Sequence, residues 1–496
     1  MLRKKILTNT FINTVGKFLS FLLQLFIITF LIKSIGKESY GLLVLALAIV
    51  GNTNLLEAGF GLSVTKYVAE YHAKKDNKMM MEIVNTNFLV ATVLALIFSL
   101  LLVIINEFVI DKIFAIPHES IEEVKSLIRI LIGLSIIEFW SASIMRIAEG
   151  LQKYMLVRIM ELIKWSLRGG FVVFAAMAGY RLEGIGFAYL AAGALSLFIF
   201  YVAVFTEKNG LIIGIRFIST KSFKLLFSFS IWIFLSKIFS FFSYRIDTIL
   251  IGLFLSPVYL TYYNIAFKIY EMMSFGFSVL SYTVVPVTSE LNVLVDKKRL
   301  NILFQKSTKY LLLTMYPLLT FLLFYSGFII KLWVGKGFET SVTLCQLFMI
   351  SLFFTAIGFS GAQIVVGLDR LKELVPYSGL AVLINFTTSL ILIQKIGING
   401  VVIGTIIGTI FIMTGYLYYF MKLFDFSITG FLKDILWWPS AIAAILSLFF
   451  VITKNFYISI IVLIFTILFV FKFIVDKEDR DAILRFAFLK KSYYQK

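Results

Sequence analysis

The sequence predicts an all-α protein that crosses a membrane about fourteen times. Hydrophobic residues make up 60% of the 496 positions and charged residues 15%, whereas soluble domains are nearer half apolar and a quarter charged. Many apolar runs reach the roughly 18–20 residues that a helix needs to cross a bilayer. These runs are continuous rather than alternating, which excludes a transmembrane barrel. An internal repeat further predicts two six-helix halves followed by two additional helices.

The spans follow from the apolar runs in chain order. The first follows the basic segment Met1–Lys5 without a small-residue cleavage site, so we interpret it as a span rather than a signal peptide. The fifth carries four charges in its first half and can insert only if its charged stripe faces protein or water. Within that stripe, Glu161 and Lys164 are predicted to pair at i,i+3. The predicted spans cover residues 10–32, 40–64, 84–106, 126–149, 157–179, 184–205, 225–254, 259–288, 308–330, 342–367, 374–394, 398–421, 435–453 and 456–475.

Basic residues in the connections predict the orientation. If the N-terminus is cytoplasmic, the inside connections hold about three times as many Lys and Arg as the outside ones. Both termini are therefore predicted to lie on the cytoplasmic side of the cytoplasmic (inner) membrane. The net charge of +18 is dispersed among the connections, which argues against a nucleic-acid partner. The single Cys345 excludes an internal disulfide, and His72 and His118 lie in separate loops, so no metal site is predicted.

Three pairs of short segments, about 220 positions apart, predict the repeat. The first pair places Lys17 and Lys237 in the same Lys-x-x-Ser-Phe setting. Parallel repeats of six spans are a known transporter plan. The predicted domains are residues 1–215, 216–424 and 425–496, the last holding two extra spans and a basic tail. The paired segments are Gly16–Phe21 with Ser236–Phe241, Gly150–Lys153 with Gly367–Arg370, and Gly184–Gly186 with Gly400–Val402.

Charges inside the spans mark the candidate functional positions, because hydrocarbon does not solvate an ion. Those in the span interiors all fall in the first eight predicted spans. Bases outnumber acids, so pairing cannot neutralise every cation, and the surplus favours an anionic ligand. The bases are Lys17, Arg129, Arg146, Lys164, Arg168, Lys237, Arg245 and Lys268; the acids are Glu57, Glu138, Glu149, Glu161, Asp247 and Glu271.

Each of these charges also has a structural interpretation. Lys17 lies about 10 Å into its span, so its side chain can extend to the interface as readily as face a cavity. Lys237 lies deeper, which favours a cavity. Arg245 and Asp247 lie on opposite faces of one helix, and one of them is expected to pair with the next helix. There Lys268 and Glu271 form either a structural ion pair or part of a site.

Several short motifs occur in order along most of the chain. They are Ile35–Gly41, Glu57–Leu62 with Val68–Tyr71, and Tyr244–Gly252 followed by Tyr262–Ala266. These motifs resemble the multidrug/oligosaccharidyl-lipid/polysaccharide (MOP) exporter superfamily, and within it the polysaccharide repeat-unit flippases of the O-antigen and capsule type. Fourteen spans suit the family, whose pattern often has Asp where this chain has Glu57.

The resemblance implies a flippase that moves polyprenyl-pyrophosphate-linked oligosaccharides by alternating access, in contact with membrane lipids and alongside a polymerase and glycosyltransferases. No phosphate loop or nucleophile constellation is present, and we expect neither enzyme activity nor a cofactor. A flippase for a lipid-linked peptidoglycan precursor and a cation-coupled drug exporter are the alternatives. The expected substrate-binding residues are Lys17, Lys164, Arg168, Lys237, Arg245 and Lys268, and the expected structural or ion-coupling carboxylates are Glu57, Asp247 and Glu271.

Overall fold

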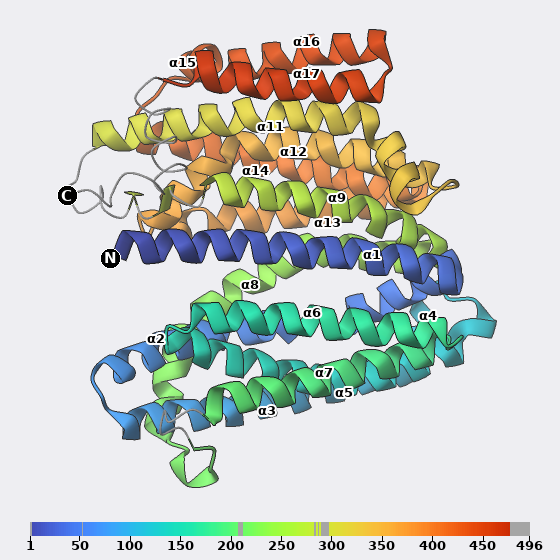
Figure 1. The fold of residues 1–496 in the computed structure, drawn as a ribbon, viewed down its shortest axis with the longest axis vertical. Coiled ribbons are helices and arrows are strands. Elements are labelled where there is room, and N and C mark those ends of the chain that lie inside the picture. Colours follow the sequence, from blue (N-terminus) through green and yellow to red (C-terminus); the bar gives the residue numbers. More distant parts are fainter. Residues whose placement is uncertain are drawn as a thin grey trace, which may run out of the picture. The chain divides into compact units, whose positions relative to one another are not determined.

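The structure is a computed structural model that describes residues 2–51, 53–206, 212–281, 284–285, 287–288 and 297–476. For residues 2–15, 17, 53–60, 228–244 and 297 it describes the backbone alone. Helices make up nearly all of this part of the chain, and no strand occurs in it (Figure 1). The predicted all-α class is confirmed.

Long helices lie at all fourteen predicted span positions. Short helical segments join several of them: α4 (Ile110–Ile113), α15 (Ile428–Gly430) and brief 3₁₀ or π turns. The long helices are α1 (Leu2–Val50), α2 (Thr53–Ala73), α3 (Asn77–Phe108), α5 (Ile121–Gly150), α6 (Tyr154–Met177), α7 (Leu182–Phe205), α8 (Thr220–Phe254), α9 (Pro257–Ser281), α11 (Lys297–Val334), α12 (Glu339–Gly367), α13 (Val375–Ile396), α14 (Ile398–Phe424), α16 (Trp437–Thr453) and α17 (Phe456–Phe469).

The first two spans differ from the prediction in where they bend and break. The connection between them is a single kink in α1 at Gly36, whose φ of 82° is a conformation that favours glycine. The predicted second span, 40–64, is not one helix, because α1 ends at Val50, Gly51 forms a turn and α2 begins at Thr53. A count of apolar residues does not register this break, although Gly and Asn are weak helix formers.

Ten of the described helices are long and apolar enough to cross a membrane by composition alone. The other long helices in the described ranges are α2, α6, α8 and α9. These four hold every predicted site residue except Lys17. Because a charge cannot face hydrocarbon at low cost, these helices need protein or water along one side.

The ends of α5 and α12 show that the sequence repeat is also a structural repeat. Each helix stops in the same hydrogen-bonded turn, and Gln152 and Asp369 share a φ of 58° there. The last residue of each helix, Gly150 or Gly367, packs tightly against another helix. A Cβ on Gly150 would lie 2.7 Å from that of Val68, and a Cβ on Gly367 would lie 2.8 Å from that of Thr288.

The contacts on the other side of these two joints are repeated as well. Val68 lies on α2, just after the second predicted span, and Thr288 ends the eighth; the two residues are 220 positions apart, as Lys17 and Lys237 are. Positive-φ glycines also join the fifth span to the sixth and the eleventh to the twelfth, at Gly179 (80°) and Gly397 (63°). These matching features support the predicted division into two six-helix repeats, which stays a prediction.

The chain divides into two compact units, residues 1–264 with 389–401, and residues 265–388 with 402–496. In the first unit, α3, α5, α6 and α7 run alongside one another (Figure 1). Its core includes Val64, Ile147 and Phe200 from three different helices. In the second unit, the two extra helices α16 and α17 pack on α11, where the Tyr325 and Ser459 hydroxyls lie 2.6 Å apart.

Candidate functional site

A cluster of three charged side chains joins α5 to α6. Glu138 lies in the middle of α5, and its carboxylate accepts hydrogen bonds from Lys164 and from Arg168 on α6. The Arg168 Nη2 atom lies 2.6 Å from Glu138 Oε1, while Lys164 Nζ contacts the other carboxylate oxygen. The three side chains are only 11–17% exposed. We call Glu138, Lys164 and Arg168 the charge cluster.

Local sequence explains why α6 presents both cations on one side. Lys164 and Arg168 are four residues apart, so they lie one above the other on the helix surface. Two aromatic rings lie beside Arg168. Its guanidinium lies 5.3 Å from the Trp165 ring centre and 5.1 Å from the ring centre of Tyr189 on α7. A cation over an aromatic face is attracted by the negative face of the ring.

One pairing predicted for α6 is wrong. Glu161 was expected to pair with Lys164, but it lies 2.5 Å from Arg158 Nη1 instead, one turn earlier. Lys164 contacts Glu138 on the neighbouring helix. The reason is that a spacing of three residues brings Glu161 equally close to Arg158, and the buried Glu138 is a stronger partner for the remaining cation.

The charge cluster carries a surplus of positive charge. It contains two cations and one carboxylate, so its net charge is +1. The Arg168 Nε–H is buried and has no hydrogen-bond partner. A buried donor without an acceptor costs stability, and an anionic oxygen would satisfy it by a charge-assisted hydrogen bond. The cluster is therefore suited to binding an anion such as a phosphate group.

Two other predicted carboxylates, Asp247 and Glu271, have described side chains that make other contacts. Asp247 is 2% exposed, and its Oδ2 accepts a hydrogen bond of 3.0 Å from the Tyr263 hydroxyl on α9. Arg245 is half-buried on the same helix. In the second unit, Lys268 and Glu271 form an ion pair of 2.7 Å in which the Glu271 side chain is 51% exposed. The ion pair, one of the two interpretations of Lys268 and Glu271, is present, and a role of these residues in a site stays a prediction.

The side chains of Lys17, Lys237 and Glu57 lie outside the described residues. The backbone places them on α1, α8 and α2. Their roles stay predictions.

Comparison with known proteins decides the family. A family model described as polysaccharide biosynthesis protein matches residues 6–292, which is more than half of the chain. The chain belongs to this family. A Shigella flexneri protein named as a candidate O-antigen transporter is 26% identical over 391 residues, covering 76% of this chain and 90% of that protein.

Solved structures show the same fold. The lipid II flippase MurJ in an inward closed conformation matches with a TM-score of 0.74 and 18% identity, covering 96% of this chain and 99% of that one. A multidrug resistance MATE family transporter of the MOP superfamily, in an inward-facing conformation, matches with a TM-score of 0.70 and 14% identity. The match covers 82% of this chain and 94% of that one. The chain is thus a multi-pass membrane protein of the polysaccharide biosynthesis family, with the fold of these solved transporters.

Two of the family motifs form a joint between α1 and α9. The Tyr40 hydroxyl donates a hydrogen bond of 2.9 Å to Asn264, and the Thr261 hydroxyl donates one of 2.6 Å to the Lys37 carbonyl. Between these bonds, the Cα of Gly41 lies so close to α9 that a Cβ would lie 1.9 Å from the carbonyl oxygen of Pro257. These motif residues therefore fix how two helices meet.

The third motif supports the same end of the first unit. A Cβ on Gly252 would lie 2.7 Å from the side chain of Leu45, and the Gly252 carbonyl accepts a hydrogen bond of 2.9 Å from the Ala115 N–H. The motifs at Ile35–Gly41 and Tyr244–Ala266 thus make structural contacts. They identify the fold better than they identify the substrate.

Sequence reasoning missed the residue that organises the charge cluster. Glu138 was recognised as an acid within a span but was not assigned to a site, because it lies 26 residues before Lys164. No helical periodicity connects two residues that far apart. Tyr189 was missed for the same reason, whereas Trp165 lies three residues before Arg168 and could have been found from helical spacing. Only the packing of α5, α6 and α7 brings the five side chains together.

Proposed function

We propose that the protein flips polyprenyl-pyrophosphate-linked oligosaccharide repeat units across the cytoplasmic membrane for cell-surface polysaccharide biosynthesis. The observation that carries this proposal is the buried charge cluster with its net positive charge. Membership of the polysaccharide biosynthesis family supports the sugar cargo, and the relative named for O-antigen transport supports the repeat-unit class. The mechanism would be alternating access, in which the cluster is exposed to one side of the membrane at a time.

Glu138 has a definite role in this mechanism. Without cargo, its carboxylate neutralises part of the charge of Lys164 and Arg168. A pyrophosphate carries more charge and more acceptor oxygens than one carboxylate, so it competes for the same cations and can also accept from the Arg168 Nε–H. The cargo would therefore enter by exchange with an internal anion rather than by binding to bare cations.

Lys17 lies on α1, a helix that packs beside this cluster. α1 packs against α6, where a Cβ on Gly169 would lie 2.9 Å from the Ile27 side chain. The first and fifth spans run in the same direction, so the level of Lys164 corresponds to about residue 22 of α1. Lys17 lies about 8 Å further along at 1.5 Å per residue. Lys17, Lys237, Arg245 and Lys268 remain proposed contacts of the cargo.

The charge of the cluster separates this proposal from a drug exporter. A cationic drug would be held by a surplus of carboxylates, whereas the cluster has a surplus of cations. A lipid-linked peptidoglycan precursor also carries a pyrophosphate, so the cluster suits it equally. The two cargoes differ in their sugars and must be compared directly.

The first test is a flipping assay on the Lys164→Met variant. Methionine removes the surplus charge but leaves the Arg168–Glu138 pair intact, so the protein should fold. We expect at least a tenfold loss of flipping of a pyrophosphate-linked oligosaccharide in vesicles, with abundance within about twofold of the unmodified protein. Lys331→Met, on an exposed lysine in the second unit, is the control.

Two outcomes of this assay bear on the proposal. Normal flipping by Lys164→Met would exclude the charge cluster as a cargo site. Faster flipping of a peptidoglycan precursor than of repeat-unit oligosaccharides, again dependent on Lys164, would keep the site and change the substrate.

The proposed orientation has its own test. Reporter fusions after Lys75 and Lys298 and at the C-terminus should report the cytoplasmic side, because the basic connections are retained there. Fusions within Glu119–Glu123 or Gly335–Phe338 should report the outside. A cytoplasmic signal from Gly335–Phe338 would contradict the orientation.

A further inference from the structure

The linker between α7 and α8 is fastened to the side of α3. This segment joins the first six-helix repeat to the second. Asn85 is 3% exposed. Its side chain donates a hydrogen bond of 2.9 Å to the Ile212 carbonyl and accepts one of 2.7 Å from the Gly214 N–H. Further along the linker, the Ser219 N–H donates a hydrogen bond of 3.1 Å to the Thr86 hydroxyl. The linker is thus held at a fixed place on α3.

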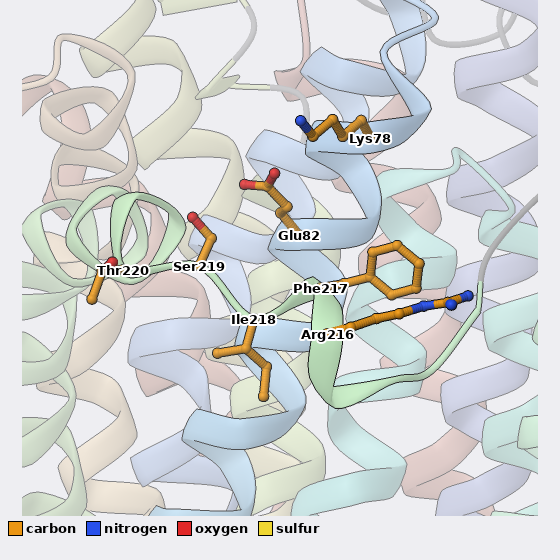
Figure 2. A pocket seen from close by; sticks show the side chains of 7 residues that line it. All are labelled: Lys78, Glu82, Arg216, Phe217, Ile218, Ser219 and Thr220. Atoms are coloured by element: carbon orange, nitrogen blue, oxygen red, sulfur yellow. The ribbon is translucent and has the colours of Figure 1, made fainter.

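A pocket of about 580 Å³ lies between α3 and this linker. Figure 2 shows Lys78 and Glu82 on the same side of α3, one turn apart, with Ser219 beneath them and the Arg216 side chain directed away to the other side. Lys78 and Arg216 are exposed and form no ion pair with a described carboxylate. Glu82, the acidic member, accepts a hydrogen bond of 3.4 Å from the Ser222 hydroxyl. The pocket is lined by Lys78, Glu82, Arg216, Phe217, Ile218, Ser219 and Thr220.

The pocket continues the apolar, exposed stripe of α3. From Leu89 onward this stripe is apolar, with Leu96 57% and Leu100 63% exposed. Leu89 to Phe108 spans about 28 Å at 1.5 Å per residue, close to the thickness of a bilayer's hydrocarbon core. Lys78 and Glu82 of the pocket precede Leu89 on the same helix face, which places the pocket at the level of the lipid headgroups. The stripe, at spacings of three and four, contains Lys78, Glu82, Asn85, Leu89, Val93, Leu96 and Leu100.

The linker adds apolar and basic side chains that suit a lipid. Ile212, Ile213 and Ile215 are 52%, 44% and 87% exposed, which is costly in water but favourable against acyl chains. Lys221 and Lys224 follow on the first turns of α8, and both are exposed. Apolar residues beside several cations at headgroup level match a phospholipid with an anionic head.

We infer that this pocket binds an anionic glycerophospholipid of the membrane leaflet next to the linker. Lys78 contacts the headgroup phosphate, Arg216 adds positive charge on the other side of the linker, and the exposed isoleucines contact the acyl chains. Because the linker joins the two repeats, a bound lipid would hold this connection against α3. Flipping should then depend on the content of anionic lipid as well as on the cargo.

The test measures lipid binding directly, so it does not depend on the proposed cargo. Full-length protein in nanodiscs of phosphatidylcholine is titrated with phosphatidylglycerol, and bound lipid is counted by native mass spectrometry. Each basic residue near an anionic membrane surface contributes about fivefold to affinity, so Lys78→Gln/Arg216→Gln should bind about 25-fold more weakly. Glu82→Gln should bind more tightly, because it removes the one acidic member. Lys331→Gln/Lys336→Gln, which removes two exposed cations in the second unit, should have no effect.

Three results would overturn the inference. One is unchanged phosphatidylglycerol binding by the Lys78→Gln/Arg216→Gln variant, provided that this variant elutes as folded protein. Another is displacement of the lipid by millimolar inorganic phosphate, which would show a free-anion site. The third is unchanged binding by Ile212→Ser/Ile215→Ser, because the acyl contacts would then contribute nothing.

Discussion

Glu138→Gln is expected to reduce the amount of folded protein sharply, although the substitution removes a single charge. Glu138 is the shared partner of Lys164 and Arg168, and all three side chains are largely buried. Removing one partner of a buried ion pair costs about 3–5 kcal/mol, because the remaining charge is left without compensation. Here two cations lose their partner at once. Abundance and melting temperature of the purified protein would measure the loss.

A second substitution tests the cause of this loss. Adding Lys164→Met to Glu138→Gln removes one of the two stranded cations, so part of the stability should return. The Arg168 guanidinium would remain between Trp165 and Tyr189, which keep an attractive contact with it. Failure of the double variant to recover any stability would show that the cost comes from packing rather than from charge.

Glu271→Gln is the matched control for this experiment. Glu271 also pairs with a lysine, at 2.7 Å from Lys268, but its side chain is 51% exposed. Exposed ion pairs contribute about 0–1 kcal/mol, so this variant should remain as abundant as the unmodified protein. If Glu138→Gln were equally abundant and only transport were lost, Glu138 would be a protonation or exchange site rather than a structural partner.

The fold was predictable from the sequence because long apolar runs are local signals. Each helix is specified by its own residues, and the repeat could be detected from short matches such as Gly150 and Gly367. The break at Gly51 was not predicted, since hydropathy over a window averages out a single turn. The sequence also gave no indication that one kink at Gly36 would be the whole connection between the first two spans.

The site was predictable only in part, for a different physical reason. The cost of burying charge singled out Lys164 and Arg168 without any knowledge of their neighbours. Which acid neutralises them depends on helix packing, and the nearest acid in sequence, Glu161, proved to be the partner of Arg158. Asp247 likewise accepts a hydrogen bond from Tyr263, a residue that a search for charged partners passes over.

Gly41→Ala is expected to destabilise the folded protein strongly, because Gly41 lies where α1 meets α9. A Cβ at this position would lie 1.9 Å from the Pro257 carbonyl oxygen and 3.2 Å from the Thr261 hydroxyl oxygen. The first of these atoms belongs to the backbone, so no side-chain rotation relieves the clash and the two helices must separate. Separation would also break the Thr261 bond to the Lys37 carbonyl and the Tyr40 bond to Asn264.

Overpacking typically costs about 1–3 kcal/mol, and a clash with backbone that breaks two hydrogen bonds should reach the upper end or exceed it. Gly170→Ala is the matched control, because it lies within α6 with no atom within 4 Å of its added Cβ. That variant should be neutral or more stable by about 0.5–1 kcal/mol, since alanine favours a helix over glycine. Thermal unfolding of both variants in detergent measures the difference. Equal stability of the two would show that the close approach at Gly41 is absent, and the family motif around it would then need a role in transport rather than in folding.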